Sequence, residues 1–157
     1  MEQLDDTLVR EVRIAARPDI VFAYFTDPER MTRWKGVSAE LDPKPGGVYS
    51  VRINPKVCAR GEYVAVEPYH RVVFSWGWEG EELVPPGSST VEVTLRPDGD
   101  GTLLRLRHSG LPTAESVAQH THGWEHYLGR LVTAAAGGDP GPDPMAAEPQ
   151  PAPQATA

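Results

Sequence analysis

The chain has 157 residues, 39% of them hydrophobic, a single cysteine and a formal net charge of −7 at pH 7. This length predicts one domain, and the acidic balance argues against a nucleic-acid partner or an anionic membrane surface, because both recruit basic patches. Cys58 has no partner for an intramolecular disulfide. The absence of a secretion signal and of any apolar run near the roughly 20 residues that span a bilayer predicts a cytoplasmic protein with no membrane partner.

The first quarter of the chain predicts a strand followed by two short helices. Residues 7–15 alternate apolar and polar side chains, as a half-buried strand does. Pro18 suits the first turn of a helix, and the apolar spacing from Ile20 to Phe25 continues it. Residues 28–34 predict a second short helix that ends at Lys35-Gly36.

From Val37 onward the pattern is that of strands separated by proline, glycine and asparagine turns. Consecutive strands with short turns predict an antiparallel sheet. The alternation does not decide which face of residues 48–67 would line a cavity. The predicted strands are residues 37–41, 48–53, 57–67, 71–78, 90–96 and 102–109.

The last regular element is a long amphipathic helix from Thr113 to about Ala136. Thr113 can cap its first turn, and Gly137-Gly138 ends it. A glycine inside a helix costs about 1 kcal/mol relative to alanine, so Gly123 predicts a close approach of the helix to a neighbouring element. A helix with one wide apolar face has to pack against another apolar surface, and we expect that surface to be the predicted sheet.

The chain divides into a flexible N-terminus at residues 1–6, a domain at residues 7–136 and a tail at residues 137–157. Proline, alanine and glycine dominate the tail, and no aromatic residue remains in it. Such a composition cannot bury enough apolar surface to offset the conformational entropy that ordering would cost. We therefore expect a disordered tail that contributes nothing to stability.

Four of the five histidines lie between His108 and His126. His122 and His126 share a helix face beside Glu125, but no third ligand is indicated, so we predict an exposed polar face and no metal site. His108 and His120 each fit either a ligand contact or general base or a satisfied core histidine. No catalytic motif is found, because the serines lack a nucleophile-elbow context, and no cofactor is predicted.

Aromatic side chains are the other candidates for a site. Phe74, Trp76 and Trp78 fall on one parity of a predicted strand. Together with Trp34 and Trp124 they could line an aromatic pocket or simply fill the core. The sequence leaves these two alternatives open.

Several short motifs, in this order, resemble the SRPBCC (START-like, helix-grip) superfamily, and within it the family of the C-terminal domain of the activator of the heat-shock-protein-90 ATPase. The resemblance covers roughly residues 7–136. Its motifs are VFAYFTDPERMTRW ending at Trp34, Pro45-Gly46-Gly47, Gly61 before Glu67-Pro68, Val73 to Trp76, and His108 to Pro112 followed by His120, Gly123-Trp124 and Leu128.

The resemblance implies an α+β helix-grip fold: a curved antiparallel sheet of about seven strands wrapped around a long C-terminal helix, with two short helices after the first strand. It also implies a cavity between sheet and helix. The expected cavity residues are Trp34, Phe74, Trp76, Trp78, His108, His120, Trp124 and Leu128.

Three functions remain open from the resemblance. The first is a protein that binds a small apolar or aromatic ligand, which we favour. The second is an aromatase/cyclase-like enzyme that uses the same cavity, although the family carries no universal catalytic residue. The third is a co-chaperone-like interaction domain with a chaperone partner. Either a monomer or a homodimer is compatible with each of them.

Overall fold

The computed structural model describes residues 6–146, so the predicted flexibility of residues 1–5 and disorder of residues 147–157 lie outside it. The predicted element order is confirmed. The elements are β1 (Leu8–Ile14), α1 (Pro18–Ala23), α2 (Pro28–Met31), β2 (Ser38–Leu41), β3 (Val48–Asn54), β4 (Val57–Glu67), β5 (Arg71–Trp76), β6 (Ser89–Asp98), β7 (Gly101–Ser109), α3 (Ala114–Ala135) and the short 3-10 helix η1 (Pro144–Ala146). Within residues 6–146, no helix is long and apolar enough to span a membrane.

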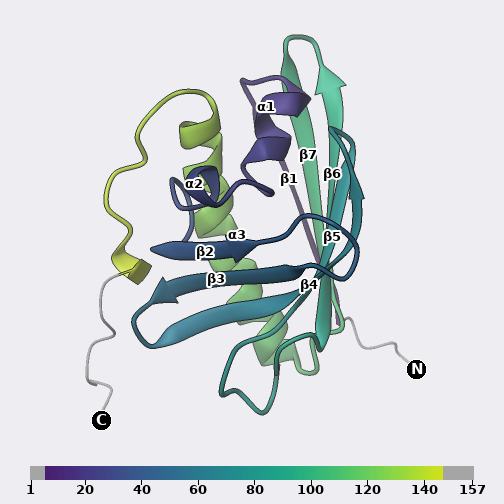
Figure 1. Ribbon diagram of the computed structural model, residues 1–157, viewed down its shortest axis with the longest axis vertical. Coiled ribbons are helices and arrows are strands. Elements are labelled where there is room, and N and C mark those ends of the chain that lie inside the picture. The colour runs from purple at the N-terminus through teal and green to yellow at the C-terminus, as the bar shows by residue number, and fades with distance from the viewer. Residues whose placement is uncertain (1–5, 147–157) are drawn as a thin grey trace.

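The seven strands form one antiparallel sheet in the order β1-β7-β6-β5-β4-β3-β2. The register shifts between Arg52 and Asn54 where β3 pairs with β4, and between Tyr63 and Ala65 where β4 pairs with β5. Such irregularities bend a sheet and increase its twist. Figure 1 shows the result: β2, β3 and β4 run across the direction of β6 and β7, and α3 lies in the concave side.

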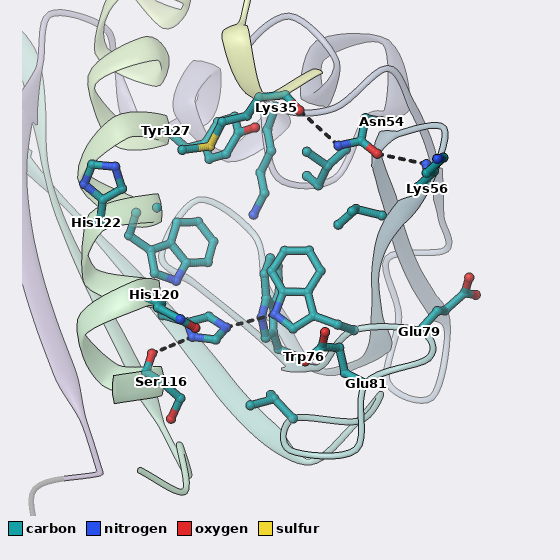
Figure 2. A pocket seen from close by; sticks show the side chains of 18 of the residues that line it. Lys35, Asn54, Lys56, Trp76, Glu79, Glu81, Ser116, His120, His122 and Tyr127 are labelled. Atoms are coloured by element: carbon teal, nitrogen blue, oxygen red, sulfur yellow. Dashed lines mark hydrogen bonds between the residues drawn. The ribbon is translucent and has the colours of Figure 1, made fainter. Parts of the chain in front are cut away.

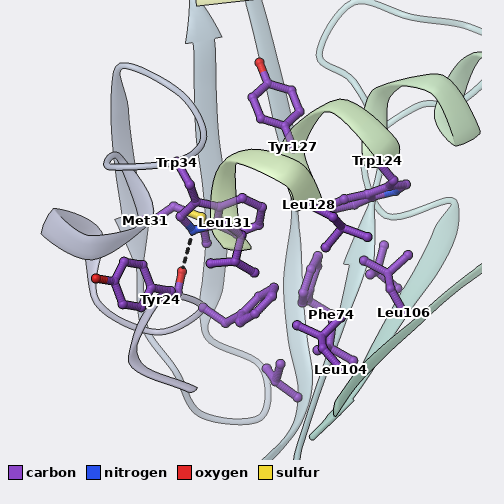
Figure 3. Packing of buried hydrophobic residues seen from close by; sticks show 14 of the residues in the cluster. Tyr24, Met31, Trp34, Phe74, Leu104, Leu106, Trp124, Tyr127, Leu128 and Leu131 are labelled. Atoms are coloured by element: carbon purple, nitrogen blue, oxygen red, sulfur yellow. Dashed lines mark hydrogen bonds between the residues drawn. The ribbon is translucent and has the colours of Figure 1, made fainter. Parts of the chain in front are cut away.

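The core fills the space between this concave face and α3 (Figure 3). Trp124, Leu128 and Leu131 are buried along the helix and face side chains of the central strands. Burying each side chain of this size stabilises the fold by about 1.5–3 kcal/mol. Tyr127 is also buried on α3, although its position falls outside the predicted apolar stripe.

The ends of α3 follow the predicted signals. The Ser116 amide donates to the Thr113 hydroxyl over 3.0 Å, and the Ser116 hydroxyl in turn accepts from the Thr113 amide, which makes a reciprocal cap. At the other end Gly137 has a φ of 96°, which ends the helix after Ala135.

The turn between α2 and β2 is held from three sides. The buried Trp34 ring donates its Nε1–H to the Tyr24 carbonyl over 3.0 Å, and Arg130 of α3 donates to the Trp34 carbonyl over 3.0 Å. Gly36 follows with a φ of 86°, and a Cβ there would lie 2.6 Å from Val51 Cγ1. Only glycine fits this turn, which therefore fixes the direction of Lys35 between Trp34 and Gly36.

Residues 137–146 differ from the predicted disordered tail because they pack back on α3 and run down to the edge of β3 (Figure 1). Asp143 accepts hydrogen bonds from Tyr127 Oη over 2.7 Å and from His126 Nε2 over 2.8 Å. Arg130 Nη1 donates to the Gly141 carbonyl over 3.0 Å. Partial burial alone would raise the pKa of Asp143, but these hydrogen bonds hold it below its usual value.

We therefore expect a chain that stops after Gly138 to be less stable than the full chain, by about 2 kcal/mol. The loss combines hydrogen bonds to Asp143, worth about 1 kcal/mol each, with the apolar contact of Met145. Urea unfolding of both chains measures it. An Asp143→Asn variant should lose part of the same stability, and equal midpoints for all three would show that the segment contributes nothing.

A cavity between the sheet and the long helix

A cavity of about 630 Å³ lies between α3, the end of β3 and the loop that follows β5 (Figure 2). Pro144 and Met145 of the docked segment line one side of it. This segment is fixed there by a hydrogen bond of 3.2 Å from Asn54 Nδ2 to the Met145 carbonyl. The wall includes the aromatic side chains of Trp76, Trp78, Trp124 and Tyr127.

Half of the predicted cavity residues line this space, namely Trp76, Trp78, His120 and Trp124. The others are fully buried and do not line it, namely Trp34, Phe74, His108 and Leu128. Phe74 precedes Trp76 by two positions on β5, and its ring stacks on Tyr49 at a centroid distance of 4.0 Å. Leu128 follows Trp124 by one helical turn. Both lie deeper because the space between sheet and helix is filled there by the core.

His108 is a satisfied core histidine behind Trp124. Trp124 Nε1 donates to its Nδ1 over 3.0 Å, so Nδ1 is an acceptor and the proton sits on Nε2. Nε2 then donates to the Ser89 hydroxyl over 2.8 Å, and that hydroxyl donates to the Trp76 carbonyl over 2.9 Å. Burial first, then the neighbouring His120 and Lys35, lowers the pKa of His108 to about 2. This chain of bonds fixes the indole that forms the cavity wall.

His120 lines the cavity, but both of its ring nitrogens are occupied. Its Nδ1 donates to the Ser116 carbonyl over 2.7 Å, and its Nε2 accepts from Trp78 Nε1 over 3.0 Å (Figure 2). Burial lowers the pKa of His120 despite the opposing hydrogen bond to Ser116. His120 is therefore a neutral residue that orients Trp78 rather than a free base.

The histidine pair of the helix does not form a metal site among residues 6–146. His126 donates to Asp143, whereas His122 is exposed at the cavity edge. No set of three or more potential ligands of the described chain comes together elsewhere.

Lys35 is the functional candidate that sequence reasoning missed. Only 3% of its surface is exposed, and its side chain reaches into the cavity (Figure 2). Its Nζ lies 4.0 Å from the ring centre of Trp76 and 3.9 Å from that of Trp124. Its side-chain amine makes no hydrogen bond or ion pair with any residue between 6 and 146, and its backbone amide donates to the Met31 carbonyl over 2.9 Å. Burial lowers the pKa of Lys35 well below its usual value.

The residues around Lys35 predict an exposed side chain instead. A lysine followed by glycine at the end of a short helix ordinarily caps that helix and stays in water. Lysine is also among the residues that are almost never fully buried without a partner. The only hint in the sequence is that Lys35 directly follows Trp34, a large residue that has to be buried.

Gly123 lines the cavity instead of approaching a neighbouring element closely, so that prediction is wrong. A Cβ built on Gly123 meets no atom within 4 Å. The space that the glycine leaves is part of the cavity.

Gly123→Ala is accordingly expected to stabilise the protein by about 0.5–1 kcal/mol, the difference in helix propensity. Gly129 on the same helix also has nothing within 4 Å of a Cβ and does not line the cavity. Gly129→Ala should give the same gain in denaturant unfolding. Destabilisation by Gly123→Ala alone would restore the close-approach interpretation.

A curved sheet that grips one long helix around an aromatic cavity defines a helix-grip domain of the START-like (SRPBCC) superfamily. Within it, the family model described as Activator of Hsp90 ATPase homolog 1-like protein matches residues 15–136. The chain belongs to this family. No curated protein matches it.

Solved structures agree with this assignment. The AHSA1-like protein RHE_CH02687 from Rhizobium etli is 54% identical, with 91% of this chain and 89% of that chain covered and a TM-score of 0.72. CalU16 from Micromonospora echinospora is 31% identical over 88% of this chain and 77% of its own, with a TM-score of 0.70. An Hsp90 activator from Plasmodium falciparum shares the fold at 24% identity and a TM-score of 0.66, over 80% of this chain and 92% of its own.

Proposed function

We propose that the protein binds a small, planar, largely apolar molecule in the cavity between α3 and the sheet. The single observation that carries this proposal is the cavity itself, which has the size and aromatic lining of a small-molecule site. Indole rings of Trp76, Trp78 and Trp124 line the cavity and offer apolar surface to a flat ligand. Trp124 and Trp78 are fixed before binding by their hydrogen bonds to His108 and His120, so little ordering entropy is lost on binding.

The aromatase/cyclase alternative has less support. General acid–base catalysis needs a free titratable group within reach of the substrate. His108 lies behind Trp124, and both nitrogens of His120 are bonded to protein groups. Among the described residues the Lys35 amine is free, but neither histidine can join it as an acid–base pair. A chaperone partner rests on the family description alone, and for this chain it stays a prediction.

The test is a titration with N-phenylnaphthylamine, a neutral apolar probe whose fluorescence rises in dry surroundings. We expect saturable binding by the full chain. Gly123→Leu should abolish it, because the added side chain fills the cavity without striking other atoms near its Cβ.

Gly129→Leu is the matched control, since it makes the same change on the same helix away from the cavity. It should leave probe affinity unchanged. Equal affinities for both leucine variants would place the probe elsewhere on the molecule and remove the support for a binding cavity.

A further inference from the structure

The Lys35 amine forms no hydrogen bond or ion pair with residues 6–146, lies against the rings of Trp76 and Trp124 and is directed into a cavity. A buried charged ammonium ordinarily has a carboxylate partner, because leaving it unpaired in apolar surroundings is costly. Here Nζ lies over aromatic rings, with the ring centre of Trp76 at 4.0 Å, that of Trp124 at 3.9 Å and that of Tyr127 at 5.5 Å. Ring faces attract a cation only modestly compared with a carboxylate. The arrangement therefore favours the neutral amine, which agrees with the effect of burial on the pKa of Lys35.

A neutral amine in an apolar pocket is a nucleophile toward carbonyl carbon. We propose that Lys35 binds ligands that carry an aldehyde or ketone by forming an imine with them. This inference rests on the proposed function, because it assumes that an apolar ligand enters the cavity, and it adds the chemical group that such a ligand carries.

The reaction balances without an oxidant or reductant. The lone pair of Nζ attacks the carbonyl carbon, and one amine proton moves through water to the carbonyl oxygen to give a carbinolamine. The C–O bond then breaks, the second amine proton is lost and a C=N bond forms. One water is released in all, and hydrolysis by one water returns the free lysine and the carbonyl compound.

The alternative ligand chemistry is an anion that pairs with a charged Lys35. Two features of the described residues oppose it. Glu81 lines the cavity, where Glu79 is paired with Arg60 and Lys56 lies at the exposed edge, and the chain as a whole carries a net charge of −7. Glu81 and the net charge repel an anionic ligand on its way in. A neutral carbonyl compound meets no such barrier, and its aromatic part can pack on the indole walls.

The turn that carries Lys35 suits this role. Trp34 is anchored to Tyr24 and Arg130, and Gly36 fits against β3 too closely for any side chain. The backbone on both sides of Lys35 is thereby fixed. The amine is held at one place in the cavity wall, so that an incoming carbonyl meets it in a defined position.

The experiment uses naphthaldehyde with the full chain and sodium borohydride, which reduces an imine to a stable secondary amine. The sequence has only three lysines, Lys35, Lys44 and Lys56, so peptide mass mapping assigns every lysine adduct. Lys44 and Lys56 are exposed and serve as internal references, together with the N-terminal amine. We expect about tenfold more adduct on Lys35 than on Lys56, because the neutral amine is the form that attacks a carbonyl and burial favours that form for Lys35.

Lys35→Met should remove this adduct, whereas Lys44→Met, a change at an exposed lysine that does not line the cavity, should keep it. If adducts form only on the exposed amines and none forms on Lys35, the proposal is overturned. Naphthoate binding more tightly than naphthaldehyde, without trapping, would also overturn it and make Lys35 an anion anchor.

Naphthalenemethanol, which has the same ring but no carbonyl, separates the two proposals. Saturable binding of this alcohol to wild type and to Lys35→Met, without trapping of the aldehyde on Lys35, retains the binding function and rejects the imine. If neither compound binds, both proposals fail together.

Discussion

Replacing Trp124 with leucine is expected to lower the free energy of unfolding by about 3–5 kcal/mol and to weaken probe binding. The indole packs on Trp76 at a centroid distance of 5.3 Å, and its Nε1–H satisfies His108. Leucine leaves part of that volume empty and leaves the buried Nδ1 of His108 without a donor. Chemical denaturation and the probe titration measure the two effects separately.

Trp78→Leu is the comparison for this prediction. Trp78 also donates its Nε1–H to a histidine, but it is only partly buried at the cavity edge, so His120 can exchange the lost bond for water. We expect a smaller loss of stability, with a comparable loss of probe affinity. If Trp124→Leu reduced binding and left stability unchanged, the hydrogen bond to His108 would contribute nothing to the free energy of unfolding.

The second large effect is the response of stability to acid. The folded pKa of His108 is about 2 because the ring is buried, whereas in the unfolded chain it is near 6.5. Between these values the unfolded state binds more protons, so stability rises with pH in this window and is lost as the pH falls below about 6.5. The loss approaches about 1.4 kcal/mol per pH unit, or roughly 2 kcal/mol between pH 6.5 and pH 5. His120, whose pKa is also lowered, contributes with the same sign.

His108→Gln isolates the contribution of this residue. The amide oxygen of glutamine can accept from Trp124, and its amide nitrogen can donate to Ser89, but glutamine does not titrate. Urea unfolding of both proteins from pH 7 to pH 5 should give a flatter profile for the variant. Parallel profiles would mean that His108 does not titrate on unfolding, contrary to its buried position.

The fold follows from local patterns in the sequence. Alternation over residues 71–78 put Phe74, Trp76 and Trp78 on one parity. Although β5 ends at Trp76, both tryptophans contact α3, through Trp124 and His120 respectively. Thr113 and Gly137 mark the limits of α3 because capping depends on residues within one turn. Patterns of this kind need no knowledge of distant contacts.

The site depends on contacts between distant segments, which no local pattern encodes. Lys35 looks like a helix-ending residue until Trp34 is seen to be fixed by α3. His108 has the same strand parity as a ligand-facing residue, but Trp124 stands between it and the cavity. Residues 137–146 lack apolar periodicity and dock through polar contacts such as those of Asp143, which composition does not reveal.

A binding protein has to keep a stable core and also select its ligand. In the loop between β5 and β6, residues 77–88, these two tasks fall to different residues. The loop is attached to β4 at its base by the bridge between Ala59 and Trp78 and by the hydrogen bond from the Glu79 amide to the Cys58 carbonyl. The side chains of Glu79, Glu81 and Leu83 line the cavity, whereas Val84 of the same loop is buried in the core. Changes at these three lining positions could therefore alter the ligand preference while Val84 and the rest of the core are kept. For the same reason, a library randomised at these three positions is the most economical start for redirecting the cavity to a chosen compound.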